Sequence, residues 1–188
     1  MKKKIIFILL ISLFLISCSG MTVKEQYNER EKINKMVDYT ISELSKKNPK
    51  LQDSLDNSEG YAVANMKLTK IPVIGIGGGP GVVIDKTTDE HVYLDIRRID
   101  FGGGWGARSY KILMVINNKE ILEDFKTGKW VFEFGGEASV GTVAADENTG
   151  ALVKDIQAYI LADGGVSATI TVRAIRAKVN KKLTEEIE

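Results

Sequence analysis

The chain has 188 residues with 26 basic and 25 acidic side chains, which gives a formal net charge of +1. Without the three lysines at positions 2 to 4 the balance is 23 to 25, which argues against a generally basic nucleic-acid-binding protein. Cys18 is the single cysteine, so no intramolecular disulfide can form and stability must come from burial of apolar side chains. The length suits one domain with a core of its own.

The N-terminal segment has the pattern of an exported lipoprotein. Lys2 to Lys4 precede an apolar run over Ile5–Ile16, which has the length of a signal-peptide core. A membrane-spanning helix needs about 20 apolar residues, so this run is too short for one. The run ends in Leu15-Ile16-Ser17-Cys18, which resembles a lipobox, the motif in which the cysteine thiol is alkylated by diacylglycerol. The alternative is an ordinary secretory peptide with an incidental cysteine.

The lipobox predicts both the domain organisation and the address of the protein. We expect residues 1–17 to be removed as a signal peptide, residues 18–24 to form a lipidated tether, and residues 25–188 to form a single domain. Cys18 would then carry covalent diacylglycerol and acyl chains and hold the protein in the cell envelope. Ser19 stands where aspartate would often signal retention in the inner membrane, so we expect the outer membrane, facing the periplasm.

Three helices are predicted along the chain. Over Val23–Lys46 the apolar positions are spaced as on one stripe of an amphipathic helix: Ile33, Val37, Ile41 and Leu44. Asn48-Pro49 would end it, because the residue before proline avoids the helical region. Leu51 and Leu55 indicate a short second helix, and residues 118–125 a third with Gly128 beyond its end. The stripe of the first helix suits packing on a sheet better than shallow insertion in a membrane, which stays open.

From Tyr61 onward, alternating apolar and polar residues replace the helical period and predict strands. The predicted strands are Tyr61–Asn65, Val73–Gly78, Gly81–Ile84, His91–Ile99, Ala107–Asn117, Trp130–Val143, Asp155–Ala162 and Val166–Val179. Asp163-Gly164-Gly165 is typical of a hairpin turn between the last two. The expected fold is α+β, with the N-terminal helix and the short second helix packed on a mostly antiparallel, glycine-rich, curved sheet or partly closed barrel.

The glycine clusters at residues 75–81 and 102–106 do not have the pattern of a phosphate-binding loop. They contain no Walker A motif, and strand-like sequence rather than a helix follows each of them. Catalysis also has little support, because His91 is the single histidine and no hydrolase motif surrounds it. Asp146-Glu147-Asn148 lacks the ligand spacing of a calcium loop. We therefore expect no catalytic residue, no metal site and no cofactor.

Six segments in order carry a resemblance to a known family. They are Ser58–Val63, Ile74–Val83, Phe101–Arg108, Lys111–Asn117 with Lys119–Phe125, Glu133–Val140, and Ile156–Gly165 with Val166–Ile175. In this order they resemble the glycine-punctuated motifs of the SYLF family of lipid-binding domains, over roughly residues 33–179. The resemblance implies a bacterial lipoprotein branch that binds lipid without catalysis. The phosphoinositide and actin partners of eukaryotic members are not expected in a bacterial envelope.

The preferred hypothesis is therefore a non-catalytic module that contacts a phospholipid head group through local basic residues. The candidates include Lys67 and Lys70, in an expected loop over Met66–Pro72; the full set is Lys67, Lys70, Arg97, Arg98, Arg108, Arg173 and Arg176. A second hypothesis is an envelope structural or stress-linked module that binds a protein partner at an exposed sheet edge. A hydrolase is the third.

Overall fold

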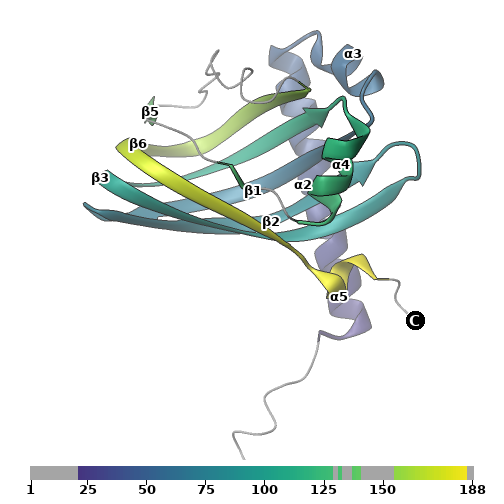
Figure 1. Cartoon of the computed structure of the whole chain (residues 1–188), viewed down its shortest axis with the longest axis horizontal. Helices are drawn as coiled ribbons and strands as arrows, with labels where there is room; N and C mark the ends of the chain where they lie inside the picture. Colours follow the sequence, from purple (N-terminus) through teal and green to yellow (C-terminus); the bar gives the residue numbers. More distant parts are fainter. Residues whose placement is uncertain (1–20, 129–130, 133–136, 141–154, 186–188) are drawn as a thin grey trace, which may run out of the picture.

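The computed structural model describes residues 21–128, 131–132, 137–140 and 155–185, and for residues 131–132, 137–140 and 164–174 it describes the backbone alone. Within this part the fold is α+β, with helices first and then an open, six-stranded sheet whose strands pair antiparallel (Figure 1). The elements are α2 Val23–Lys47, α3 Leu51–Asp56, β1 Gly60–Lys70, β2 Ile74–Asp85, β3 Glu90–Ile116, α4 Lys119–Lys126, β4 Val131–Phe132, β5 Glu137–Val140, β6 Ile156–Val179 and α5 Lys181–Thr184. The expected class, the N-terminal helix and the antiparallel pairing are confirmed.

Local signals set the ends of α2. The Thr22 hydroxyl accepts a hydrogen bond from the Glu25 amide at 3.3 Å, and the Glu25 carboxylate accepts one from the Thr22 amide at 2.7 Å, which forms a capping box. At the other end the Asn48 side chain donates to the Leu44 carbonyl at 2.9 Å, just before Pro49. The helix therefore begins at Val23, inside the expected tether, and ends one residue beyond the predicted Lys46.

The predicted breaks between strands are wrong at four places. The expected Met66–Pro72 loop is mostly strand, since β1 continues to Lys70. The two strands predicted on either side of Gly79 are one strand, β2, and those on either side of the second glycine cluster are one strand of 27 residues, β3. The hairpin turn expected at residues 163–165 lies within β6 instead. Partners on neighbouring strands explain this, because each glycine segment is paired along its length.

The long strands β3 and β6 organise the sheet. The first part of β3 pairs with β2, its second part pairs with β1, and β1 and β2 pair with each other. β6 pairs with β3 from Leu94 to Ile116, with a register shift at Ser109/Tyr110 that leaves Asp163 unpaired in the ladder. The β1–β2 turn and the middle of β3 consequently meet at one end of the sheet, which we call the tip.

Helices cover the two faces of the sheet and divide the core between them. On one face, the α2 face, α2, α3 and α5 pack against strand residues that include Val63, Val82 and Leu113. On the opposite face, the α4 face, Leu122 and Phe125 of α4 pack against Met114 and other strand residues. Within the described residues, no helix is both long and apolar enough to cross a membrane.

Candidate functional site

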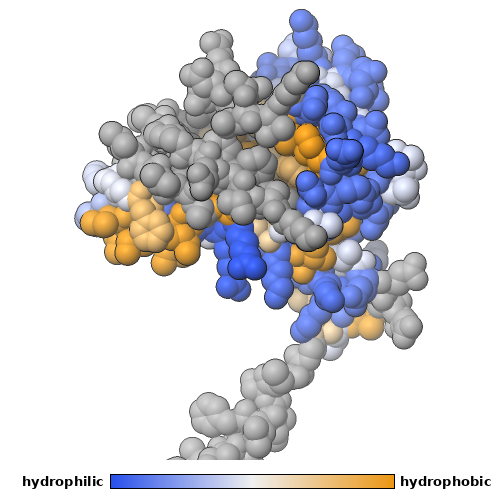
Figure 2. Space-filling model, in the orientation of Figure 1, coloured by the Kyte–Doolittle hydropathy of each residue, from blue (hydrophilic) through white to orange (hydrophobic). Residues whose placement is uncertain are grey.

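Large apolar side chains are exposed together at the tip of the sheet. They come from the β1–β2 turn, the start of β2 and the middle of β3: Ile71, Val73, Ile74, Ile76, Ile99, Phe101 and Trp105, which we call the apolar tip. Trp105 is 71% exposed and Ile76 is 68% exposed. Figure 2 shows apolar side chains gathered at this end of the molecule, at the left of the view. A contiguous exposed apolar patch marks an interaction surface.

Strand pairing brings the members of the apolar tip together. Ile74 pairs with Phe101 and Ile76 with Ile99, so these side chains lie side by side on the α2 face. The turn is held by hydrogen bonds from the Ile71 amide to the Ile74 carbonyl at 3.0 Å and from the Gly102 amide to the Val73 carbonyl at 2.9 Å.

The glycines of β3 set the shape of the tip. Gly102, Gly104 and Gly106 have φ angles of 134°, 138° and 145°, a region that L side chains rarely adopt. Trp105 stands between two of these glycines. The segment 102–106 thus has a backbone conformation that requires glycine at three positions, and it carries the exposed aromatic side chain of Trp105 between two of them.

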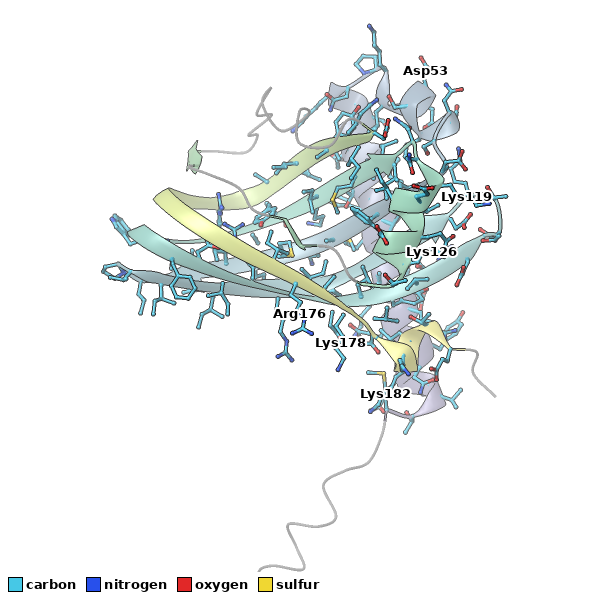
Figure 3. The ribbon with its side chains drawn as sticks, viewed as in Figure 1. Asp53, Lys119, Lys126, Arg176, Lys178 and Lys182 are labelled. Atoms are coloured by element: carbon cyan, nitrogen blue, oxygen red, sulfur yellow. The ribbon has the colours of Figure 1, made fainter. Side chains whose placement is uncertain are left out.

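A row of basic side chains crosses the same face one step back from the apolar tip. Lys67 pairs with Gly78, Gly78 with Arg97, and Arg97 with Arg176, so the basic side chains come from β1, β3 and β6, with Gly78 of β2 between the first two. The three cations are exposed, and we call them the basic row. In Figure 3 the side chains of Arg176 and Lys178 point to the same side of the molecule. The α2 face therefore carries an apolar end bordered by positive charge.

The α4 face behind the tip carries buried charges. Arg98 donates to both carboxylate oxygens of Asp100, at 2.7 Å each, and to the Tyr110 hydroxyl at 2.6 Å. Burial alone lowers the pKa of Arg98, but its bonds to Asp100 and its proximity to Tyr110 outweigh burial, so the pKa is raised and the charge is retained. Arg108 is also buried, with its guanidinium 5.3 Å from the centre of the Tyr110 ring.

The structure separates the predicted head-group contacts into two sets. Lys67, Arg97 and Arg176 lie exposed in the basic row, whereas the others described are buried on the opposite face: Lys70, Arg98 and Arg108. Cys18 and the Arg173 side chain lie outside the described residues, as does the acidic turn Asp146-Glu147-Asn148. The apolar tip was not predicted, although Ile71 and Val73 on either side of Pro72 form an apolar turn where polar residues are usual.

His91 lies near the start of β3, close to an acidic side chain. The ring is partly exposed, and its Nε2 lies 3.8 Å from the carboxylate of the fully exposed Asp89. A shallow hollow of about 560 Å³ lies elsewhere, between α2 and α3, lined by Asp38, Ile41, Ser42, Ser45, Lys46 and Gln52. Among the described residues, no three His, Cys, Asp or Glu side chains are grouped to hold a metal ion.

Comparison with known proteins gives a distant relative. The chain is 23% identical over 156 residues to beta cell expansion factor A of Aeromonas veronii, and the match covers 81% of this chain and 58% of that protein. The chain thus matches less than two thirds of the relative's length. No protein-family model matches the chain, and no solved structure matches it.

Proposed function

We propose that this chain is a lipid-anchored envelope protein whose non-catalytic domain binds the bilayer surface through the apolar tip. The observation that carries the proposal is the group of exposed apolar side chains on one end of the α2 face, next to the basic row. Tryptophan is enriched at membrane interfaces, where its ring is apolar and its N–H is hydrated, and Trp105 is the most exposed member of the tip. The basic row fits anionic head groups.

The expected binding energy is large enough to measure without the anchor. Burying one large apolar side chain contributes about 1.5–3 kcal/mol, so three residues of the tip contribute about 5 kcal/mol. A single myristoyl chain binds membranes with a constant of about 10⁴ M⁻¹, which is a similar free energy. The domain alone should therefore bind vesicles weakly and reversibly.

The position of Cys18 supports the bilayer as the occupant of this surface. Met21 follows Cys18 by three positions, so the two residues lie at most about 11 Å apart. Met21 packs on the α2-face core, so an acylated Cys18 would hold that face near the membrane. In the view of Figure 1, α2 begins at the lower side, to which Arg176, Lys178 and Lys182 point in Figure 3.

The family, the curvature of the sheet and the membrane that holds the anchor are part of the same proposal. Membership of the SYLF family is proposed from its ordered motifs, and a curved sheet is proposed because β1 pairs with β2 and also with β3. The outer membrane is proposed from Ser19. Fractionation of the native envelope with intact-mass analysis tests the anchor, since an unmodified thiol or a retained leader would contradict it.

Vesicle flotation of the chain from Ser19 onward tests the surface itself. This chain lacks the Cys18 sulfur and keeps every described element. We expect it to float with phosphatidylglycerol vesicles, and the triple variant Ile76→Ser, Phe101→Ser, Trp105→Ser to stay unbound with an unchanged thermal transition. The double variant Tyr27→Ser, Tyr39→Ser removes exposed aromatic rings from α2 and should float like the parent. Equal flotation of the triple variant would contradict the proposal.

A further inference from the structure

Lys70 is a buried cation with an unexplained environment. It is the last residue of β1, lies on the α4 face, and is 3% exposed. Its ammonium nitrogen makes no hydrogen bond or ion pair with the described residues. An ammonium group removed from water is costly unless an anion or acceptor compensates it, so an unsatisfied one calls for an unseen partner.

The carboxylate of Asp100 does not compensate the charge of Lys70. Lys70 pairs with Gly75, and Gly75 pairs with Asp100, so Lys70 and Asp100 share a face with a bare glycine between them. A Cβ on Gly75 would lie 3.0 Å from the Asp100 Cβ, so glycine at this position leaves the space between Lys70 and Asp100 free of a side chain. Both oxygens of Asp100 already accept hydrogen bonds from Arg98. Asp100 therefore neutralises Arg98, and the charge of Lys70 remains.

Donors for an oxyanion are present on this face of the sheet. The ammonium has three N–H groups, and the described hydrogen bonds of Arg98 use three of its five. Ile71, which follows Lys70 directly, is 65% exposed and belongs to the apolar tip. A buried positive charge therefore lies next to an exposed apolar surface. A molecule with an anionic group and an apolar chain could contact both.

We propose that Lys70 binds the acid group of an anionic lipid behind the apolar tip, as a carboxylate or a phosphate, with Arg98 on the same face of the sheet as a further donor. The inference extends the proposed function, and the assignment of a lipid as the ligand rests on that function. The oxyanion site itself does not depend on membrane binding. One negative charge at Lys70 would compensate the buried ammonium.

Equilibrium dialysis of the full chain, purified from membranes in a neutral detergent, tests the site with labelled inorganic phosphate and labelled octanoate. We expect at least one of the probes to bind at a single site. Loss of a buried charged partner weakens binding by about 30-fold or more, which is the effect expected for Lys70→Met. Lys119→Met, at an exposed lysine of α4 outside the apolar tip and the basic row, should bind like the parent.

Thermal unfolding gives an independent readout. Lys70→Met removes an uncompensated charge, so in the absence of probe its Tm should equal or exceed that of the parent, and the probe should no longer raise it. A lower Tm for Lys70→Met, without probe binding by the parent, would identify a carboxylate of the chain itself as the partner and overturn the proposal. Equal binding by the parent and Lys70→Met would also overturn it.

Separate variants test membrane binding by the apolar tip and anion binding at Lys70, so one can be contradicted without the other. The tip variant Ile76→Ser, Phe101→Ser, Trp105→Ser should keep the octanoate or phosphate site even where it loses vesicle binding. Octanoate binding alone identifies a fatty acid as the source of the acid group, and phosphate binding identifies a phospholipid or free phosphate. Vesicles of phosphatidylglycerol and of phosphatidylcholine then separate these last two, because only a lipid source makes Lys70→Met weaken flotation with the anionic vesicles.

Discussion

The α2 face of the sheet differs between its two ends. Near the helices, Val82 and Leu113 are 0% exposed and lie within the core. Near the tip, Ile76, Ile99 and Phe101 are exposed, although they continue the same strands with the same alternation. Side-chain chemistry is alike at both ends, and the difference is whether a helix lies over the face.

This contrast separates what strand alternation determines from what it leaves open. Period-two alternation decides which side chains share a face. It does not decide what covers the face. An apolar end without a cover contributes little to the stability of the free protein, and an exposed apolar patch of this kind is typical of an interaction surface.

The largest effect is expected where α2 covers the sheet. Val37 of α2 is 3% exposed, and an aspartate there would bury a charge in the α2-face core. We expect Val37→Asp to destabilise the chain by more than about 4 kcal/mol, enough to unfold it. Circular dichroism would report this. An intact fold that has lost vesicle binding would instead indicate that α2 inserts in the membrane.

A matched pair of substitutions on β3 compares the two ends directly. Leu113→Ala creates a cavity in the core and should cost about 2–5 kcal/mol of unfolding free energy. Ile99→Ala, on the same strand and the same face, should change stability by less than about 0.5 kcal/mol because the side chain is exposed. Urea denaturation measures both. Similar losses in the two variants would mean that the tip is covered in the free protein.

Charge compensation also differs between the ends. Far from the tip, Lys126 of α4 contacts Asp85 at 3.1 Å, Glu90 at 2.7 Å and Glu123 at 3.1 Å. Burial alone lowers the pKa of Lys126, but its hydrogen bonds to Glu90, Glu123 and Asp85 raise it overall. Burial alone raises the pKa of Asp85, but hydrogen bonds from Lys126 and from the amides of Thr87 and Thr88 lower it below its ordinary 3.8. Lys70 at the tip has no such partner among the described residues.

These shifts predict how stability depends on pH. The lowered pKa of Asp85 stabilises the fold above its ordinary value, and this contribution is lost as the pH falls through the folded pKa, below 3.8. The raised pKa of Lys126 contributes below 10.5 and is lost at more alkaline pH. Lys126→Met should cost about 2 kcal/mol at pH 7. Urea curves for Asp85→Asn should show a smaller loss of stability between pH 5 and 2 than the parent, and parallel curves would exclude this role for Asp85.

The helices could be predicted because their signals are local. The spacing of Ile33, Val37 and Leu44 and the stop at Pro49 need no information from elsewhere in the chain. The strand ends could not be predicted in the same way. Gly164-Gly165 has the composition of a turn, but pairing with Arg108 and Ser109 of β3 keeps it extended. Long-range pairing overrides local preference in sheets.

The candidate site was predictable in part. Arg97 and Arg98 are consecutive, so alternation places them on opposite faces of a strand, and Arg98 and Asp100 two apart on the same face. That reasoning separates the exposed cation from the buried ion pair. The exposure of Ile99 and Phe101 could not be deduced, because it depends on how far α2 extends over the sheet in three dimensions.

The smallest effect is expected from the basic row. An exposed cation near an anionic membrane contributes about 1 kcal/mol, so Arg97→Gln should weaken binding to phosphatidylglycerol vesicles by about fivefold. Added salt screens exposed charges, and at 0.5 M salt the difference should disappear while binding through the apolar tip persists. Lys119→Gln is the control, because Lys119 is exposed on α4, away from Arg176 (Figure 3). Flotation at two salt concentrations measures both variants, and equal weakening by the two would mean that net charge, rather than the basic row, attracts the membrane.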